Sequence, residues 1–301
     1  MSFTNNVKNE LVKLSLTKLE EISELSSLIK NTIDKNFQIT IENASLAKLI
    51  FQLLKKNYNF FIKVSVRNGY NYNKNYIYVL DISKNNLVLL KELSLEKQIP
   101  DSYLLDDDDL KRAYLRGLFL ACGSINDPSK SRYHMEFSFT DYEYAIFIND
   151  LLNSYQLNSK CLKRENRYMV YIKESEKIGD FLRLIKATNA LLYYENIRIY
   201  RSRKNVLNRI NNCEQANVDK IIQTAKNQVD DINLLKETGV YELLDDKLKE
   251  VCDYRLKYPE VSLLELSKIM TIETNSSITK SGLHHRFNKI KTMALNVKEK
   301  I

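Results

Sequence analysis

The chain has 301 residues, 44% of them hydrophobic, so it is long enough to form two or three domains that each bury a core. It carries 46 Lys and Arg against 38 Asp and Glu, a net charge of +8 that suits a nucleic-acid partner but also many proteins without one. The N-terminus lacks the apolar core of a signal peptide, and no run reaches the roughly 18 apolar residues of a membrane-spanning helix. We therefore expect a cytoplasmic protein with no membrane partner.

The cysteines do not predict a metal site. None of them forms a C-x-x-C pair, and no histidine lies near them at ligand spacing; they are Cys122, Cys161, Cys213 and Cys252. We expect reduced, structural thiols, no bound metal and no cofactor.

The first series of predicted elements runs from a helix at 21–33 to a helix at 85–95. Between them the periodicity predicts an alternating strand at 37–43, an amphipathic helix at 44–58, and strands at 60–66 and 75–82 separated by a turn at 68–75. This order is helix, strand, helix, strand, strand, helix.

The second series repeats that order about 95 residues later. A helix containing the apolar residues Tyr114 to Ala121 ends at Gly123, and a strand at 133–141 has Met135, Phe137 and Phe139 on one face. A helix at 141–155, strands at 159–165 and 167–173 and a helix at 175–188 follow, and the segment 196–202 is a candidate for one more strand. The repetition predicts two similar αβαββα lobes.

The two glycines in the run "YLRGLFLACGSIND" need an explanation, because a glycine inside a helix costs about 1 kcal/mol relative to alanine. The chain has six glycines, and Gly117 and Gly123 both lie in this stretch. If the first helices of the two lobes cross at a pseudo-two-fold axis, small residues allow their backbones to approach. We therefore place Gly117, Ala121 and Gly123 at the interface between the lobes.

The string "LRGLFLACG" at 115–123 resembles the LAGLIDADG motif of homing endonucleases. The longer strings "KRAYLRGLFLACGSINDPSKSRYHMEF" and "IGDFLRLIKATNALLYYENIRI" resemble the WhiA family of bacterial regulators. This resemblance implies an α+β fold of duplicated LAGLIDADG-like αβαββα lobes followed by an all-α helix-turn-helix domain. It implies a first lobe with a degenerate motif, a second lobe, a connecting helix and a helix-turn-helix domain, at 1–98, 99–209, 210–239 and 240–301.

The motif lacks the carboxylates that a LAGLIDADG nuclease uses to bind divalent metal at the eighth position. Cys122 occupies that position in the second copy and Thr32 in the first, and magnesium prefers oxygen ligands. Asp34 lies two residues beyond Thr32, Asp127 lies beyond the second helix, and the acidic run at 106–109 is interpreted as helix-start charge. We expect no catalytic residues and no enzyme activity. The alternative is an active endonuclease or RNA maturase that depends on Asp34.

The C-terminal third is predicted to be helical throughout. An amphipathic helix at 215–238 ends before Gly239, and its apolar stripe comprises Val218, Ile221, Ile222, Ala225, Val229 and Ile232. Helices at 244–258, 262–270 and 280–297 follow, and Ser262 with Glu265 forms a capping box. Two short helices, a loop and a basic helix are typical of a helix-turn-helix.

The last helix is the predicted site of double-stranded DNA binding. Between Asn275 and Ile301 there are six Lys or Arg and one carboxylate, Glu299. We expect Leu283, Phe287, Ile290, Met293 and Ala294 to face the core. The side chains expected to reach base edges are Lys280, Ser281, His284, His285 and Asn288, and those expected on phosphates are Arg286, Lys289 and Lys291. An ordinary basic C-terminal helix would give the same pattern.

A second basic surface is predicted on the lobes, as a phosphate-tracking patch or simply a solvated face. It comprises Lys160, Lys163, Arg164, Arg167, Arg198, Arg201, Arg203 and Lys204. The family resemblance implies a nucleoid-associated transcriptional regulator with a role in sporulation, or in cell division and chromosome segregation. A scaffold that binds another transcription or cell-division protein through the lobes is a further alternative.

Overall fold

The computed structural model describes residues 2–68 and 76–299. It divides into two compact units, Met1–Arg201 (unit 1) and Ser202–Ile301 (unit 2), which are treated separately below. Most of the turn expected at 68–75 lies outside the described residues. None of the helices within the described ranges is both long and apolar enough to span a membrane.

The first lobe of unit 1 follows the predicted order of elements. Its sheet has the antiparallel order β1-β3-β2. Thr17 and Glu20 form a capping box at the start of α2, and Asn43 caps α3 through the amide of Leu46. The elements are α1 (Phe3–Leu11), α2 (Lys18–Lys30), β1 (Gln38–Ile41), α3 (Ala44–Tyr58), β2 (Lys63–Asn68), β3 (Tyr76–Asp81), the 3-10 helix η1 (Ser83–Asn85) and α4 (Asn86–Glu92).

The second lobe repeats this arrangement. Its sheet has the order β4-β5-β7-β6, in which β5-β7-β6 corresponds to β1-β3-β2. The duplicated αβαββα fold is therefore confirmed. The elements are η2 (Ser102–Leu104), α5 (Asp108–Cys122), β4 (Ser124–Ile125), β5 (Met135–Phe139), α6 (Tyr142–Ser154), β6 (Lys160–Arg164), β7 (Arg167–Ile172) and α7 (Ser175–Leu184).

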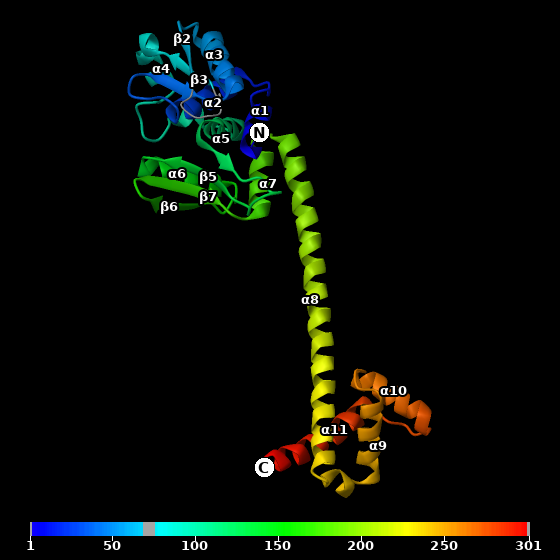
Figure 1. Ribbon diagram of the computed structural model, residues 1–301. Helices are drawn as coiled ribbons and strands as arrows, with labels where there is room; N and C mark the ends of the chain where they lie inside the picture. Colours follow the sequence, from blue (N-terminus) through cyan, green and yellow to red (C-terminus); the bar gives the residue numbers. More distant parts are fainter. Residues whose placement is uncertain (1, 69–75, 300–301) are drawn as a thin grey trace. The chain divides into compact units, whose positions relative to one another are not determined.

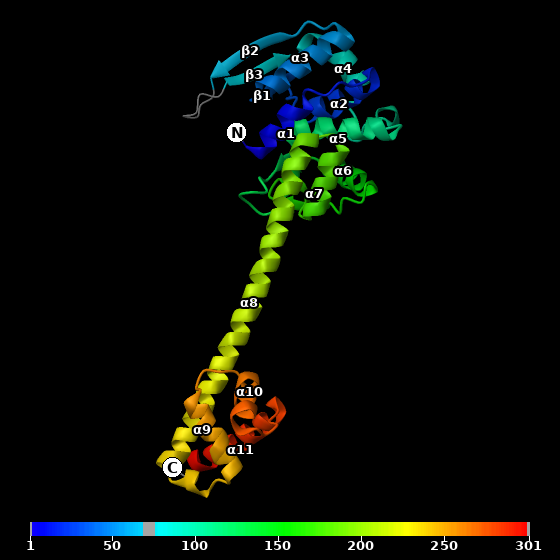
Figure 2. The same ribbon diagram turned by 90° about the vertical axis from the view of Figure 1, so that its right-hand side faces the viewer.

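Apart from the short 3-10 helices, the elements of unit 1 that were not predicted include α1 and the two-residue strand β4, which pairs with β5. In the first lobe a single bridge between Ile33 and Ile39 takes the place of β4. The two sheets lie on opposite sides of α2 and α5, which pack side by side in the middle of unit 1 (Figure 1 and Figure 2). One continuous apolar core joins both lobes through these helices.

The segment 196–202 is helical, so the additional strand considered there is wrong. It lies within α8 (Thr188–Glu237), which also contains the helix predicted at 215–238. The predicted stripe on that helix is buried only in part: Ala225 and Ile232 are buried, whereas Val218, Ile221 and Ile222 are exposed. Apolar spacing alone does not tell how far along a long helix its packing extends.

Unit 2 contains the C-terminal part of α8 and a bundle of three helices. These are α9 (Asp246–Lys257), α10 (Leu263–Thr274) and α11 (Lys280–Lys298), preceded by the 3-10 helix η3 (Val240–Leu243). The capping box of Ser262 and Glu265 is present, and Gly239 adopts a left-handed φ of 74° after α8. The helix-turn-helix order of the prediction is therefore confirmed.

The core of unit 2 contains four of the five apolar residues that were assigned to it from α11. Leu283, Phe287, Ile290 and Ala294 are buried against α9 and α10, whereas Met293 is exposed and does not belong to the core. Arg255 is buried beneath the turn between α9 and α10: its Nη1 donates to the carbonyl of Val261 at 2.7 Å and its guanidinium lies on the ring of Phe287. This contact ties the turn to α11.

Candidate nucleic-acid interface

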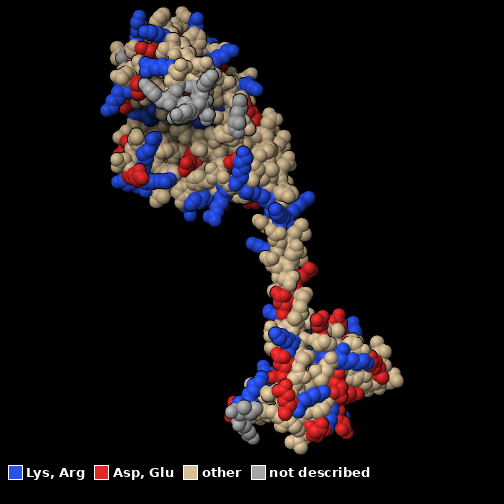
Figure 3. Space-filling view, viewed as in Figure 1, with Lys and Arg blue, Asp and Glu red and all other residues tan. Residues whose placement is uncertain are grey.

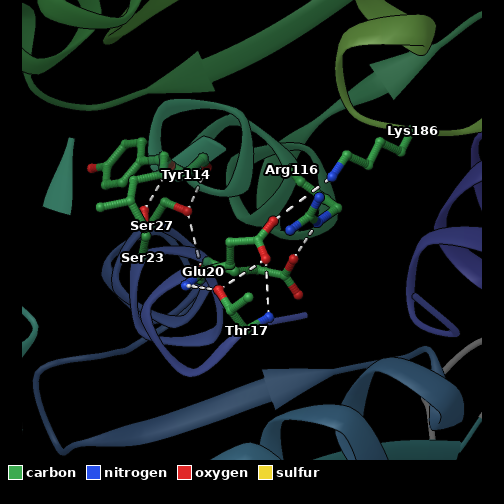
Figure 4. Close-up of polar contacts among 9 residues, drawn as sticks. Thr17, Glu20, Ser23, Ser27, Tyr114, Arg116 and Lys186 are labelled. Atoms are coloured by element: carbon green, nitrogen blue, oxygen red, sulfur yellow. Dashed lines mark hydrogen bonds and ion pairs between the residues drawn. The ribbon is translucent and has the colours of Figure 1, made fainter. Parts of the chain in front are cut away.

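The seam between α2 and α5 depends on the absence of a side chain at Gly117. A Cβ atom added there would overlap the carbonyl oxygen of Glu24 and would lie 2.9 Å from its carbonyl carbon. Ser27, the first-lobe counterpart of Gly117, turns its hydroxyl into the same seam and donates to the carbonyl of Tyr114 at 2.6 Å (Figure 4). Each helix thus presents a small residue to a backbone carbonyl of the other helix.

Position 123 is a glycine for a different reason from the close helix approach that was expected. It is the C-cap of α5, in extended conformation, and an added Cβ would overlap the ring of Phe119 on its own helix rather than α2. Ala121 lines a pocket next to the first lobe. Gly117 is therefore the predicted interface residue whose missing side chain allows the close approach of α2 and α5.

A buried ion pair also crosses the seam. The Nε atom of Arg116 donates to Glu24, and both side chains are at most 2% exposed. Burial raises the pKa of Glu24, and Arg116 opposes this with a smaller effect. Within the described residues, neither terminal nitrogen of Arg116 has a hydrogen-bond partner. The pair is therefore enclosed and only partly satisfied, which makes it sensitive to loss of either partner.

The residues at the two positions that bind metal in a nuclease, Thr32 and Cys122, are not suitable metal ligands. Thr32 donates to the carbonyl of Leu28 at 2.8 Å, and the thiol of Cys122 lies 3.6 Å from the carbonyl of Leu118. Burial raises the pKa of Cys122 to about 12, although the ammonium of Lys8 acts in the opposite direction, so the thiol is neutral at physiological pH. A neutral thiol and a hydroxyl bonded to its own helix are poor ligands for magnesium.

The other carboxylates considered for metal binding serve local turns. Asp34 accepts from the amides of Asn36 and Gln38, and Asp127 accepts from the amide and hydroxyl of Ser129. Asp107 caps α5, which confirms helix-start charge for the acidic run. Across residues 2–68 and 76–299, no three His, Cys, Asp or Glu side chains gather as a metal site would require.

The predicted lobe patch divides between two faces of the second sheet. The strand register places Lys160, Arg164 and Arg167 on the face opposite the covering helices, together with Tyr171. Lys163 lies on the other face, where its ammonium approaches the ring of Tyr168. The outer face thus carries three exposed cations and Tyr171, together with Glu136, which contacts His134 at 2.9 Å.

The remaining residues of the patch lie on α8 rather than on a strand. Arg198 is held by Glu176 and Glu195 at 2.9 and 2.8 Å, and Arg201 donates to the carbonyl of Ser131. Arg203 and Lys204 are exposed and belong to unit 2. On the visible face of unit 1, Lys and Arg outnumber Asp and Glu, whereas both signs are mixed on unit 2 (Figure 3).

The exposed side of α11 carries seven of the eight predicted DNA-contacting residues. Lys280, His284 and Lys291 recur at intervals of four and seven residues and form one stripe. Four further exposed residues lie beside this stripe on α11: Ser281, His285, Asn288 and Lys289. Thr279 caps the helix by accepting from the amide of Gly282, and Lys280 and Ser281 in the first turn are exposed.

Arg286 departs from this arrangement. It is two residues from His284 and therefore lies about 200° around the helix from it. The side chain is half-buried, and its Nη1 is enclosed without a hydrogen-bond partner inside the described ranges. Arg286 therefore lies at the edge of the surface that the other seven residues form, next to Lys289 and away from His284.

Sequence reasoning missed the residues that fix the seam. Ser27, Glu24 and Arg116 all lie within or beside the motif, but a serine and two charged residues in a helix normally indicate an exposed face. One available signal was the alignment of Ser27 with Gly117. Lys8 was missed because α1 itself was not predicted.

Comparison with known proteins gives a consistent result along the chain. The family described as the WhiA N-terminal LAGLIDADG-like domain matches residues 22–96, the WhiA LAGLIDADG-like domain matches 111–204, and the WhiA C-terminal HTH domain matches 207–294.

Relatives named "Probable cell division protein WhiA" include one from Clostridium botulinum, 39% identical over 321 residues and covering 100% of both chains. Another, from Bacillus cytotoxicus, is 38% identical over 307 residues and covers 98% of this chain and 96% of its own. The crystal structure of full-length DUF199/WhiA from Thermatoga maritima aligns with a TM-score of 0.59 at 25% identity, over 98% of this chain and 99% of the other. The chain belongs to the WhiA family.

Proposed function

We propose that the protein is a non-enzymatic DNA-binding regulator of transcription that acts in cell division. The observation that carries this proposal is the exposed surface of α11, where Lys280, His284 and Asn288 project from the second helix of a helix-turn-helix. Such helices read base edges in the major groove with residues near their N-terminus. The names of the relatives support a role in cell division. We further propose that the regulated process includes chromosome segregation, with sporulation as the alternative role.

The lobes add to this function without chemistry of their own. Their eighth-position residues are a neutral thiol and a bonded hydroxyl, so the retained scaffold offers contacts rather than hydrolysis. We assign the lobes to 1–98 and 99–209, the connecting helix to 210–239 and the DNA-binding domain to 240–301. The protein would then act in the cytoplasm at the nucleoid, with double-stranded DNA as its partner and no cofactor.

Substituting Lys280, His284 and Asn288 together by alanine should abolish sequence preference and leave weak, salt-sensitive binding. Each lost base contact removes about 1–3 kcal/mol of discrimination. The measurement is affinity of the full chain for a selected duplex and for a scrambled duplex at fixed salt.

The matched control is Lys247→Ala, which removes an exposed charge from α9 and should preserve the preference. If the triple variant still separates the two duplexes as wild type does, base recognition lies elsewhere in the chain.

A further inference from the structure

Unit 1 contains two pockets that correspond to each other through the duplication. The first, pocket A, lies between the end of β1, the start of α3, helix α1 and the C-terminal end of α5; Lys8, Thr32 and Thr40 are among its lining residues. The second, pocket B, lies between the end of β5, the start of α6, the segment 95–98 and the C-terminal end of α2; Lys30 and Arg167 are among its lining residues.

Equivalent residues of the two pockets are separated by nearly constant offsets in the sequence. The helix caps Asn43 in pocket A and Asp141 in pocket B are 98 residues apart, as are the strand residues Thr40 and Ser138. The seam-helix residues Ala121 and Asn31 are offset by 90, the same offset that relates Gly117 to Ser27. Each pocket therefore combines the strand end of one lobe with the seam-helix end of the other.

Each pocket contains one lysine whose ammonium is partly withdrawn from water. Lys8 lies 6.0 Å from the ring centroid of Phe119, and Lys30 lies 5.2 Å from that of Tyr144. Neither lysine takes part in an ion pair with the described residues; Lys30 donates to the carbonyl of Lys97. Burial lowers the pKa of both lysines, in Lys30 against a smaller opposing effect of Asp141.

Because neither lysine forms an ion pair with the described residues, each would gain from an anion that enters its pocket. In pocket B the nearby carboxylate of Asp141 reduces this gain. Pocket A is also lined by neutral residues that can donate hydrogen bonds, among them Asn5, Asn9 and Thr40. The carboxylate of Asp141 in pocket B is already engaged, because it accepts from the amide of Tyr144 and from Gln98. Glu42 in pocket A is exposed.

We propose that pockets A and B each receive one backbone phosphate of bound DNA, held by Lys8 in one pocket and Lys30 in the other. The two strands of a duplex present their phosphates with two-fold symmetry, which matches the pseudo-two-fold relation of the pockets. In a LAGLIDADG nuclease, metal ions bound by carboxylates place positive charge at these helix ends. Those carboxylates are absent here, and we assign the positive charge to Lys8 and Lys30. This inference rests on the proposed DNA-binding function and assigns a specific role to the lobes.

The test uses the full chain with Lys8→Gln, Lys30→Gln and the double variant, and it measures affinity for a selected duplex across a series of salt concentrations. Each lost phosphate contact should reduce the slope of log K against log salt by about 0.9, so the double variant should lose about 1.8. Lys8→Arg with Lys30→Arg should restore most of the slope. Lys48→Gln, which removes an exposed charge from α3, should leave it unchanged.

Thermal unfolding without DNA separates this role from a structural one. Because burial disfavours both ammonium groups and neither forms an ion pair inside the described ranges, removing the charges should change the melting temperature little. Lys30→Gln also removes the hydrogen bond to the carbonyl of Lys97, so its melting temperature is compared with that of Lys30→Arg. A double variant with the wild-type slope would overturn the inference while leaving DNA binding through α11 intact. A reduced slope accompanied by a lowered melting temperature that the arginine variants do not repair would also overturn it. Failure of wild type to bind DNA would overturn both proposals.

Discussion

Replacing Gly117 with alanine is expected to destabilise unit 1 by about 2–3 kcal/mol, although the same change in an open helix stabilises by about 1 kcal/mol. The added methyl group would overlap the carbonyl oxygen of Glu24, which belongs to the backbone of α2 and cannot rotate away. Relief requires α2 and α5 to separate, and the apolar core of both lobes is continuous through these helices. The measurement is the free energy of unfolding in urea, with hydrogen exchange in α2 and α5 to locate the effect.

Gly282→Ala provides the matched control. A Cβ at Gly282 in α11 would lie 3.3 Å from Oγ1 of Thr279, a side chain that can adjust. Its effect should stay within about 1 kcal/mol of wild type, in either direction. Equal effects of the two alanine substitutions would contradict the close approach of the seam helices.

Replacing Arg116 with methionine is expected to cost about 3–5 kcal/mol at neutral pH, because it leaves Glu24 buried without its partner. The double variant Arg116→Met with Glu24→Leu should recover most of this loss, since a well-packed apolar pair avoids the cost of desolvating both charges. Chemical unfolding of the four proteins gives the coupling energy directly.

The cost of Arg116→Met should also depend on pH. Burial raises the pKa of Glu24 above its unfolded value, and loss of Arg116 removes the main effect that lowers it. A carboxyl with a raised folded pKa favours folding below the unfolded pKa, near 4.5, and this contribution is lost as the pH rises toward the folded pKa. The variant should therefore lose less stability near pH 5 than near pH 8. A pH-independent loss would contradict this expectation, because it would mean that removing Arg116 does not change the pKa of Glu24 in the folded state.

The order of elements was predictable because the spacing of apolar residues in both lobes distinguishes strands from helices. Met135, Phe137 and Phe139 alternate along β5, and Ser262 with Glu265 marks the start of α10. The errors arose where two structures share one pattern. The segment 196–202 alternates apolar and polar residues, yet it continues α8, because its neighbours on both sides are helical. Met293 fits the apolar spacing of α11, but α9 and α10 do not reach it.

The candidate sites were predictable in composition and only partly in position. Seven residues of α11 share an exposed surface, since helical spacing and a buried opposite face fix their direction. The lobe patch required strand register to separate Lys163 from Arg164 and tertiary contacts to show that Arg198 is held by two glutamates. Lys8 on α1 approaches Phe119 on α5, which is more than 100 residues away in sequence, and no local pattern specifies this contact.

The most direct test of the account combines binding and strand integrity in one experiment. The full chain is titrated onto a supercoiled plasmid that carries a selected site, with magnesium present, over a series of salt concentrations. If α11 and the lobes bind DNA without metal-binding carboxylates, as proposed, the affinity should fall steeply with salt and the plasmid should remain uncut. Affinity that is insensitive to salt, or magnesium-dependent nicking that Asp34→Asn abolishes, would contradict the proposal.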